Sequence, residues 1–492
     1  MKKLIFCIAL IAATLSVAAQ DGITLHFMRL NPYSTYTSPS AHLQYKGWVG
    51  VPVISNINES FTNTSFHYDH LFGTNSDGVI TTIKLNDFVD HLSKKNNVFN
   101  DNLSLNIIDF GFYAKPVRIS VSWRLRVDEY MSFNKDLFAL PVHGNMAYVG
   151  ENNPATPELK LSLTSYQEIG VGIQAEIKDR FYIGVKPKFL LGVANVHTKQ
   201  ARATLYTDPE DYSMKLNYNL DAYSSCVVPY EITLDSNGTP GFNFYTNDML
   251  KNLPNLGKNL GAAIDLGFTC RINDRFGVSA SVLDLGFIRW TTYNQHITSS
   301  IAGTDTSTYY NDGSFMFNGL SADDVDLLID DPQAFADELL DYFPLNVEKQ
   351  KAYTTMLSSR FIVEGYCNLG KHHRLTALFQ GRLINKEFLP SFTVAWNGTF
   401  LNIFDLCVSY TIAKKSYTNL GVGIGFNLGV FHIYAATDNL IAICTHKSPQ
   451  RSLVNATNAN IQMGIVFDWG KLYEKKLDND INKKHKNDSV EP

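Results

Sequence analysis

Charged side chains of both signs occur at alternate positions in several extended segments. These residues are Arg124, Arg126, Asp128, Glu168, Glu176, Lys186, Lys188 and Asp265. A spacing of two places residues on the same face of a β-strand. Carboxylates, guanidinium groups and ammonium groups that share an enclosed face can line a polar path, or they can pair and block it. Because mixed charges pair readily in a small space, we favour the blocked arrangement.

The sequence contains none of the motifs that usually carry catalysis or metal binding. No G-x-S-x-G motif presents a nucleophile, and the glycines between Gly421 and Gly425 lie on a strand without the helix that a nucleotide site needs. Two polar clusters, at 67–70 and 323–331, lack the ligand sets of known metal sites, and we interpret them as solvated residues. We therefore predict no enzyme activity, no catalytic or metal-binding residues and no cofactor.

Alternation of apolar and polar residues extends through most of the chain. In the segment 117–129, Ile119, Val121 and Trp123 alternate with polar residues, and the same period recurs in later segments. A period of two indicates a β-strand with one apolar face and one polar face. The polar face is rich in glycine, which is typical of the crowded interior of a barrel.

An N-terminal secretory signal indicates that the apolar faces of the strands contact membrane lipid. Two lysines precede the apolar run Leu4–Leu15, and small residues follow up to Ala19, after which we place cleavage. No later apolar stretch reaches the length of about 20 residues that a membrane-spanning helix needs. We therefore predict a bacterial outer-membrane protein, an all-β transmembrane antiparallel β-barrel, with its apolar faces in lipid and its charged faces in the lumen.

Turn positions allow the strands of this barrel to be counted. The expected strands are 104–113, 117–129, 163–177, 180–197, 259–272, 275–290, 354–369, 373–387, 390–397, 402–413, 418–427, 430–437 and 460–469, with one more from 42–72. Single-chain barrels close with an even number of strands, so we expect about 14, with a range of 12 to 16. Short turns alternate with long connections at 130–161, 198–258, 290–353 and 438–459, and we expect the long connections outside the cell.

Smaller features complete the prediction. Apolar residues recur at helical spacing in 84–93 and 322–343, which predicts small loop helices, packed on the barrel rim rather than acting as lids. Aromatic residues near strand ends are expected to form interface girdles; these are Tyr130, Phe181, Tyr182, Trp290, Tyr410 and Trp469. The net charge of -5 argues against a nucleic-acid partner.

Several stretches resemble an uncharacterised family of bacterial outer-membrane β-barrels. They are Asn31–Tyr33, Gly47–Ser55, Asn63–Phe66, Leu71–Phe72, Gly423–Phe431 and Tyr434–Asn439. The characterised barrels that this family is similar to in architecture are the long-chain fatty acid transporter family and the PorV-like barrels of type IX secretion. The resemblance implies about 14 strands, an N-terminal segment that enters the lumen, and no catalytic residues.

These observations divide the chain into four parts and leave two functions open. We expect a signal peptide at 1–19, an N-terminal segment and candidate plug at 20–41, the barrel at 42–469, and a charged disordered tail at 470–492. The first hypothesis is a passive transporter or channel for a hydrophobic or small ligand, which predicts a continuous internal pocket with a lateral gap or a plug. The alternative is a scaffold barrel that docks secreted proteins without transport, which predicts a filled lumen and long functional loops. Outer-membrane lipid surrounds the barrel in both.

Overall fold

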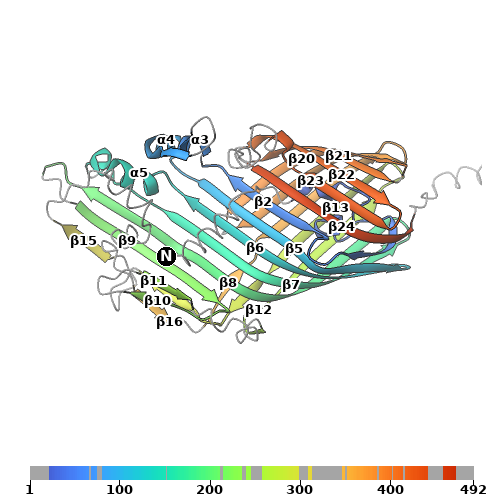
Figure 1. Ribbon diagram of the computed structural model, residues 1–492, viewed down its shortest axis with the longest axis horizontal. Helices are drawn as coiled ribbons and strands as arrows, with labels where there is room; N and C mark the ends of the chain where they lie inside the picture. Colours follow the sequence, from blue (N-terminus) through green and yellow to red (C-terminus); the bar gives the residue numbers. More distant parts are fainter. Residues whose placement is uncertain are drawn as a thin grey trace, which may run out of the picture.

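The wall of the molecule is a single antiparallel sheet that closes on itself (Figure 1). The computed structural model describes residues 22–65, 68–74, 80–150, 152–210, 214–234, 240–244, 257–298, 308–312, 346–349, 352–384, 387–401, 403–413, 416–441 and 458–472. The wall consists of β1 (Tyr45–Gly50), β2 (Ile57–Asn63), β5 (Asn97–Ala114), β6 (Val117–Phe133), β7 (Leu159–Ile177), β8 (Phe181–Thr207), β12 (Leu260–Arg271), β13 (Phe276–Trp290), β17 (Tyr353–Met356), β18 (Ser359–Asn368), β19 (His373–Ile384), β20 (Glu387–Phe400), β21 (Phe404–Ala413), β22 (Ser416–Leu428), β23 (Phe431–Thr437) and β24 (Asn458–Lys471).

The pairing of these segments gives a closed barrel of 14 strands among the described residues. β1 and β2 follow one another along the same edge of β24 and of β5, and so count as one strand position. β17 and β18 likewise share the edge of β13. Because β24 pairs with β1 and β2, which pair with β5, the sheet has no open edge along its wall. The strand number confirms the prediction from turn positions.

The first strand position is interrupted between β1 and β2, and yet the wall stays hydrogen-bonded. The backbone N–H of Val51 donates to the Ile465 carbonyl, and that of Val53 donates to the Asn106 carbonyl. Ser55 folds inward, where its carbonyl accepts a 3.0 Å hydrogen bond from the Tyr434 hydroxyl. Gly464 makes room for this fold, because a Cβ there would lie 1.8 Å from the Ser55 carbonyl oxygen.

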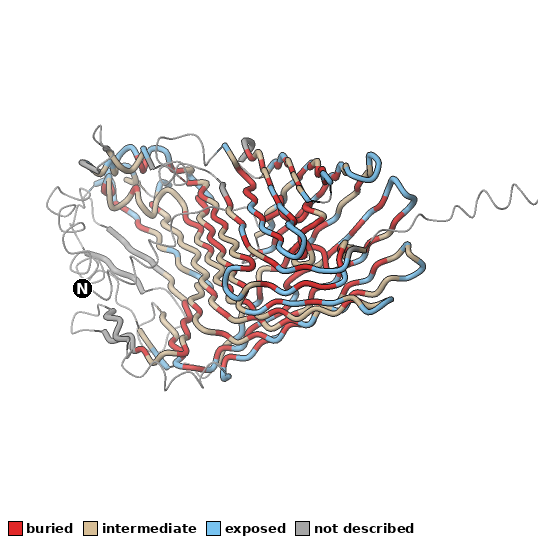
Figure 2. Tube along the Cα trace, turned by 45° about the vertical axis from the view of Figure 1, so that its right-hand side comes forward, coloured by how far each residue is buried: buried red, intermediate tan, exposed pale blue. Residues whose placement is uncertain are grey.

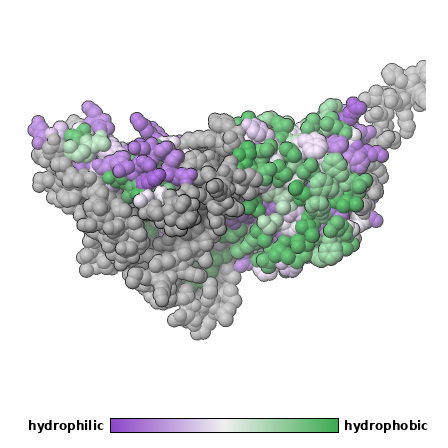
Figure 3. Space-filling model, turned by 45° about the horizontal axis from the view of Figure 1, so that its top comes forward, coloured by the Kyte–Doolittle hydropathy of each residue, from purple (hydrophilic) through white to green (hydrophobic). Residues whose placement is uncertain are grey.

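The outer face of the wall is apolar and the inner face is largely polar. Ile173 on β7 keeps 49% of its surface exposed, whereas Asp265 on the inner face of β12 keeps 1%. Buried and exposed residues alternate along the strands in Figure 2, and in Figure 3 hydrophobic residues cover much of the barrel wall. No helix among the described residues is long and apolar enough to cross a membrane. The predicted two-faced strands are therefore confirmed.

The interior holds residues 22–44, which we call the luminal segment. It contains the short helix α2 (Ile23–His26) and the 3-10 helix η1 (Pro32–Tyr36). The inner core is formed by the segment's Ile23, Leu25, Phe27, Met28, Tyr33 and Leu43 together with wall residues such as Leu283, Ile362, Leu378 and Val466. Inner-face glycines allow this close approach, since a Cβ on Gly423 would lie 2.7 Å from the Met28 sulfur. The Gly421–Gly425 run thus serves packing, as expected.

The wide end of the barrel carries additional elements (Figure 1). They are α3 (Tyr68–Leu71), β3 (Phe72–Thr74), β4 (Ile80–Ile83), α4 (Leu85–His91), α5 (Asp136–His143), η2 (Met146–Tyr148), β9 (Met214–Cys226), β10 (Tyr230–Leu234), β11 (Pro240–Phe244), β14 (Gln295–Thr298), β15 (Thr308–Asp312) and β16 (Asn346–Lys349). Phe88 and Val89 of α4 pack on Phe133 at the end of β6, so the helix predicted at 84–93 lies on the rim.

Two sequence expectations are corrected. The connection predicted at 198–258 is partly strand, because β8 runs to Thr207 and pairs with β9 beyond the barrel wall. The aromatic girdle is wrong for Tyr130, Tyr182 and Trp290, which are at most 2% exposed and point inward, whereas Tyr410 and Trp469 are exposed as expected. The signal peptide, the second predicted helix and nearly all of the tail lie outside the described residues.

Replacing Ile173 by Arg tests the assignment of the outer face. A guanidinium near the middle of the bilayer should lower the free energy of unfolding by about 2–4 kcal/mol. The measurement is urea-induced unfolding of the protein refolded into lipid vesicles, with Ile173→Leu as the matched control. An Arg variant as stable as the control would place Ile173 outside the hydrocarbon region.

Candidate functional site

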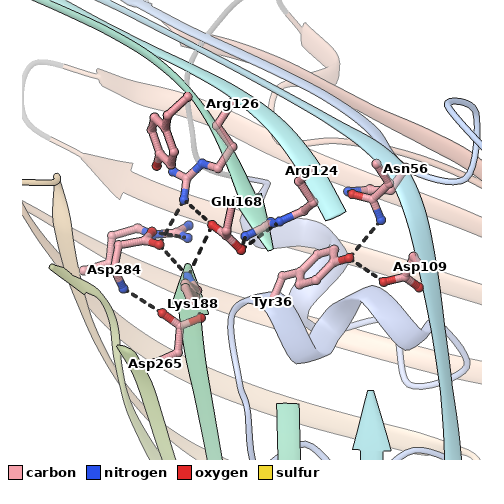
Figure 4. Close-up of polar contacts among 12 residues, drawn as sticks. Tyr36, Asn56, Asp109, Arg124, Arg126, Glu168, Lys188, Asp265 and Asp284 are labelled. Carbon is pink, nitrogen blue, oxygen red and sulfur yellow. Dashed lines mark hydrogen bonds and ion pairs between the residues drawn. The ribbon is translucent and has the colours of Figure 1, made fainter. Parts of the chain in front are cut away.

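Inward positions of five neighbouring strands bring charged residues to one place in the lumen (Figure 4). β6 supplies Arg124 and Arg126, β7 supplies Glu168, β8 supplies Lys188, β12 supplies Asp265 and β13 supplies Asp284. With Arg360 from β18, we call these residues the charge cluster. They are 0–9% exposed, so each charge depends on the others rather than on water.

Glu168 is one of the two centres of the charge cluster. Its Oε1 lies 2.5 Å from the Nη2 of Arg124, and its Oε2 lies 3.4 Å from the Nη1 of Arg126. The ammonium group of Lys188 is 3.5 Å from the same Oε2. One carboxylate without solvent exposure therefore faces three cations.

Asp284 is the second centre, and a β-bulge puts it there. The register of β12 against β13 shifts at this point, and Asp284 has a φ of 58°. Its Oδ1 lies 2.6 Å from the Lys188 Nζ and 2.9 Å from the Arg126 Nη1, and its Oδ2 lies 3.1 Å from the Arg360 Nη2. Its backbone N–H donates to Asp265, which in turn lies 2.7 Å from Lys188.

Tyr36 of the luminal segment connects the segment to this cluster. Its ring lies between two cations, 4.1 Å from the Arg124 guanidinium carbon and 4.3 Å from the Lys186 nitrogen. Its hydroxyl donates a 2.6 Å hydrogen bond to Asp109 on β5, which also accepts the Trp48 indole N–H at 2.6 Å. Cation–π contacts of this kind are worth about 2 kcal/mol where water is excluded.

Wall carboxylates hold the rest of the luminal segment. Asp438 accepts the backbone N–H groups of Ile23 and Thr24 at the start of α2. Asp405 accepts the Leu30 N–H at 3.2 Å. His26 contacts Glu364 through Nε2 and Thr37 through Nδ1, both at 2.8 Å. Most of these carboxylates therefore satisfy backbone donors that no helix or sheet partner satisfies.

Side chains from opposite walls also meet above the charge cluster. Lys160 of β7 lies 3.6 Å from Glu387 of β20. Arg382 of β19 donates to Asn102 of β5. Tyr130 of β6 packs with Ile384 of β19. These strands lie on opposite sides of the barrel, so their contacts cross the lumen. They narrow the lumen at a different height from the charge cluster, and we call them the second narrowing.

The cavities left beside the luminal segment are small. One of about 50 Å³ lies against Tyr36, Arg124 and Arg360, and another of about 60 Å³ lies against His26, Arg271 and Arg374. A cavity needs a volume of roughly 10–15 Å³ to hold one water molecule. Each therefore has room for only a few waters.

The sequence-predicted site residues differ in where they lie. Arg124, Arg126, Glu168, Lys188 and Asp265 belong to the charge cluster, with Asp128 at its edge, 3.4 Å from Arg126. Lys186 contacts Tyr36 instead, and Glu176 lies apart near a turn, where it accepts the Tyr113 hydroxyl at 2.7 Å. Within the charge cluster, the mixed charges pair with one another.

Asp284, Arg360, Asp109 and Tyr36 were not predicted. One signal was available for Asp284, because the outward apolar residues are even-numbered up to Val282 and odd-numbered from Leu285. Such a change of parity indicates an extra residue in the strand. The other three residues show no comparable signal. Within the described part of the chain, no group of His, Cys, Asp and Glu side chains could hold a metal ion.

Comparison with known proteins identifies a family without an assigned activity. The model of a family described as "Family of unknown function (DUF5723)" matches residues 39–438. No curated protein matches the sequence. Among solved structures, the Pseudomonas putida toluene transporter TodX is 7% identical over 92% of this chain and 95% of its own, with a TM-score of 0.35.

A FadL homologue from Pseudomonas aeruginosa is also 7% identical, over 92% of this chain and 99% of its own, with a TM-score of 0.31. At TM-scores this low, neither similarity says what the present chain transports or binds. The function has to be argued from the geometry of the barrel itself.

Removing the charge of Asp284 tests whether the cluster depends on it. Asp284→Asn leaves Lys188, Arg126 and Arg360 with one carboxylate fewer, and should lower the free energy of unfolding by about 3–5 kcal/mol. Asp128→Asn is the matched control, with a smaller expected loss because its contacts with Arg126 are longer. Equal losses in denaturant titrations of the vesicle-bound protein would contradict the central role of Asp284.

Proposed function

Since this chain belongs to the family of unknown function DUF5723, its activity must be inferred from its structure, and we propose an outer-membrane channel for a small solute, closed at rest by the luminal segment. The observation that carries this proposal is the occupant of the lumen. Residues 22–44, at the N-terminal end of the described chain, occupy the lumen and pack against inward side chains of the wall.

The luminal segment is attached in a way that permits movement. None of the strand pairings of the wall includes residues 22–44, so the segment can shift while the barrel stays closed. Several of its attachments are hydrogen bonds to carboxylates, among them Asp109, Asp405 and Asp438. Water can replace such bonds at a small net cost, typically about 0.5–1.5 kcal/mol for a neutral pair and more for a charged one. The apolar contacts of Ile23, Leu25 and Met28 favour the closed position.

Opening also requires the second narrowing to widen. The Lys160–Glu387 contact crosses the lumen with side chains that keep 42% and 20% of their surface exposed. Exposed ion pairs of this kind contribute about 0–1 kcal/mol. The Lys160–Glu387 pair is therefore a weak barrier, and the buried Arg382–Asn102 and Tyr130–Ile384 contacts must separate as well before the lumen opens.

A scaffold function is the second candidate, and two observations favour it. The lumen is filled, as this function predicts. β8 extends past the barrel wall to pair with β9, and β9 pairs with β14 and β15, so the wall sheet continues beyond the barrel at the wide end. Such an extension offers a surface to another protein. In that case the segment would be a permanent part of the core, and the barrel would not conduct.

Conductance in planar bilayers separates the two candidates. We expect low conductance from the full chain and more frequent open events in Tyr36→Ala, which loses the two cation contacts and the Asp109 hydrogen bond. Combining it with Glu387→Gln should increase conductance further, because both narrowings are then weakened. Tyr410→Ala is the matched control, since Tyr410 is an exposed outward tyrosine.

If the folded double variant conducts no better than the control, the channel proposal is wrong. The scaffold would then be tested by crosslinking at β9 and β14 in intact cells.

A further inference from the structure

A polar cavity of about 330 Å³ lies at the wide end of the barrel, above the second narrowing. It is several times larger than the cavities beside the luminal segment, and it falls in the size range of about 300–1,000 Å³ that is usual for small-molecule sites. We call it the vestibule cavity. Its lining consists of Lys95, Asn96, Ser132, Phe133, Asn134, Thr156, Glu158, Lys160, Arg202 and Thr204.

Part of the lining of the vestibule cavity lies on the inner face of the wall. Lys160 and Ser132 are paired across β6 and β7. The Lys160 ammonium group reaches Glu387 on the opposite wall, which is possible only through the interior. A solute that enters the wide end would therefore meet this cavity before it meets the narrowing.

The charge of the lining is opposite to that of the protein. Lys95, Lys160 and Arg202 face the cavity with one carboxylate, Glu158, and Glu387 lies 3.6 Å from Lys160, so three positive groups stand against two negative ones. The whole chain has a net charge of -5. The Arg202 and Lys160 side chains keep 54% and 42% of their surface exposed, so both remain accessible to a ligand. This local excess attracts an anion.

The other lining residues indicate which groups of a ligand, besides its anionic group, the cavity can bind. Five residues offer hydroxyl or amide groups, namely Asn96, Ser132, Asn134, Thr156 and Thr204. The one aromatic residue, Phe133, is 4% exposed and packs into the rim. The lining therefore has hydrogen-bonding groups for a polyhydroxylated ligand, and most of its side chains are polar.

The loop that forms one side of the cavity is held in place before any ligand arrives. The Asn134 side chain donates to the Thr156 carbonyl and accepts the Glu158 N–H at 3.0 Å. Asp136 accepts both the N–H and the hydroxyl of Thr156. Burial, and then the neighbouring Asp136, raise the pKa of the Tyr148 phenol, which stays protonated and donates to Asp136 at 3.1 Å. A prearranged site loses little conformational freedom on binding.

We propose that the vestibule cavity binds a sugar that carries a phosphate or a carboxylate group. Lys95, Lys160 and Arg202 would hold the anionic group, with Arg202 exchanging part of its 2.9 Å contact with Glu158 for the ligand. The hydroxyl and amide groups of Asn96, Ser132 and Thr204 would hold the sugar ring, because those of Asn134 and Thr156 are engaged within the loop. As a solute class for the channel this inference rests on the proposed function, but binding itself does not require conduction.

The test is isothermal titration calorimetry of the full-length protein in lipid nanodiscs with glucose 6-phosphate, and with glucose and inorganic phosphate as separate probes. We expect glucose 6-phosphate to bind at least tenfold more tightly than either probe. Arg202→Gln and Lys160→Gln should each weaken it about tenfold or more. Lys199→Gln is the matched control, because Lys199 is a cation on β8, as Arg202 is, and does not line the cavity.

Different outcomes separate the sugar, the anion and the source of the ligand. Equal affinity for inorganic phosphate would overturn the sugar part, and no binding of any probe would overturn the proposal. Binding with no effect of either substitution would also overturn it, by placing the ligand elsewhere. Nanodiscs with and without lipopolysaccharide distinguish the source: competition by the lipid supports its phosphorylated sugars as the ligand, and unchanged binding supports a free solute. Conductance measurements remain a separate test of the channel.

Discussion

The interior of this barrel is filled, so its buried charges must be neutralised by the protein itself. Moving an ion out of water costs several kcal/mol even after relaxation, and a partner with good geometry must offset that cost. Lys188, at the centre of the cluster, contacts Glu168, Asp265 and Asp284. The bulge in β13 follows from this requirement, since it adds a carboxylate on the inner face at the level where Arg126 and Lys188 enter. Asp284 accepts a backbone φ of 58° to reach that position, and such a conformation persists only where the surroundings over-determine it.

The same requirement explains the wall carboxylates around the luminal segment. A short helix and a 3-10 helix inside a barrel have backbone donors without partners, and Asp405 and Asp438 accept them. These contacts join residues more than 370 positions apart in the chain. The segment precedes all wall strands in the chain, whereas Asp405 in β21 and Asp438 after β23 follow most of them. Contacts of such long range carry a cost in loop-closure entropy, which grows only slowly with the length of the loop.

The fold was predictable from the sequence because a strand between lipid and lumen has two chemically different faces. That difference appears as a period of two along β7, β12, β21 and β24, and turn residues separate the periods, so even the strand number followed. Five of the charge-cluster residues followed too. Asp284 was not predicted, because the extra residue of the bulge in β13 reverses which residue numbers, odd or even, face the lumen in the rest of that strand. Parity would also have corrected the aromatic girdle, since Tyr130 shares the parity of Arg124 and Arg126. The contacts of Tyr36 with Arg124 and Asp109 have no local signal, because they depend on how a non-strand segment sits inside the barrel.

The distribution of polarity along the lumen decides between ligand classes. An apolar ligand moving through the interior would pass the vestibule lining, the Lys160–Glu387 contact and the charge cluster, and would displace water from charged groups at each level without offering them a partner. An anionic, hydroxylated ligand offers partners at the first level and competes with carboxylates for the same guanidinium groups at the next. Arg124 and Arg126 already hold carboxylates at distances of 2.5–3.4 Å, which is the geometry that a phosphate or carboxylate group would use. The first hypothesis included a hydrophobic ligand, which would offer these charged groups no partner on a path through the lumen. The anionic, hydroxylated ligand that we propose would instead replace one carboxylate by another anion at the charge cluster.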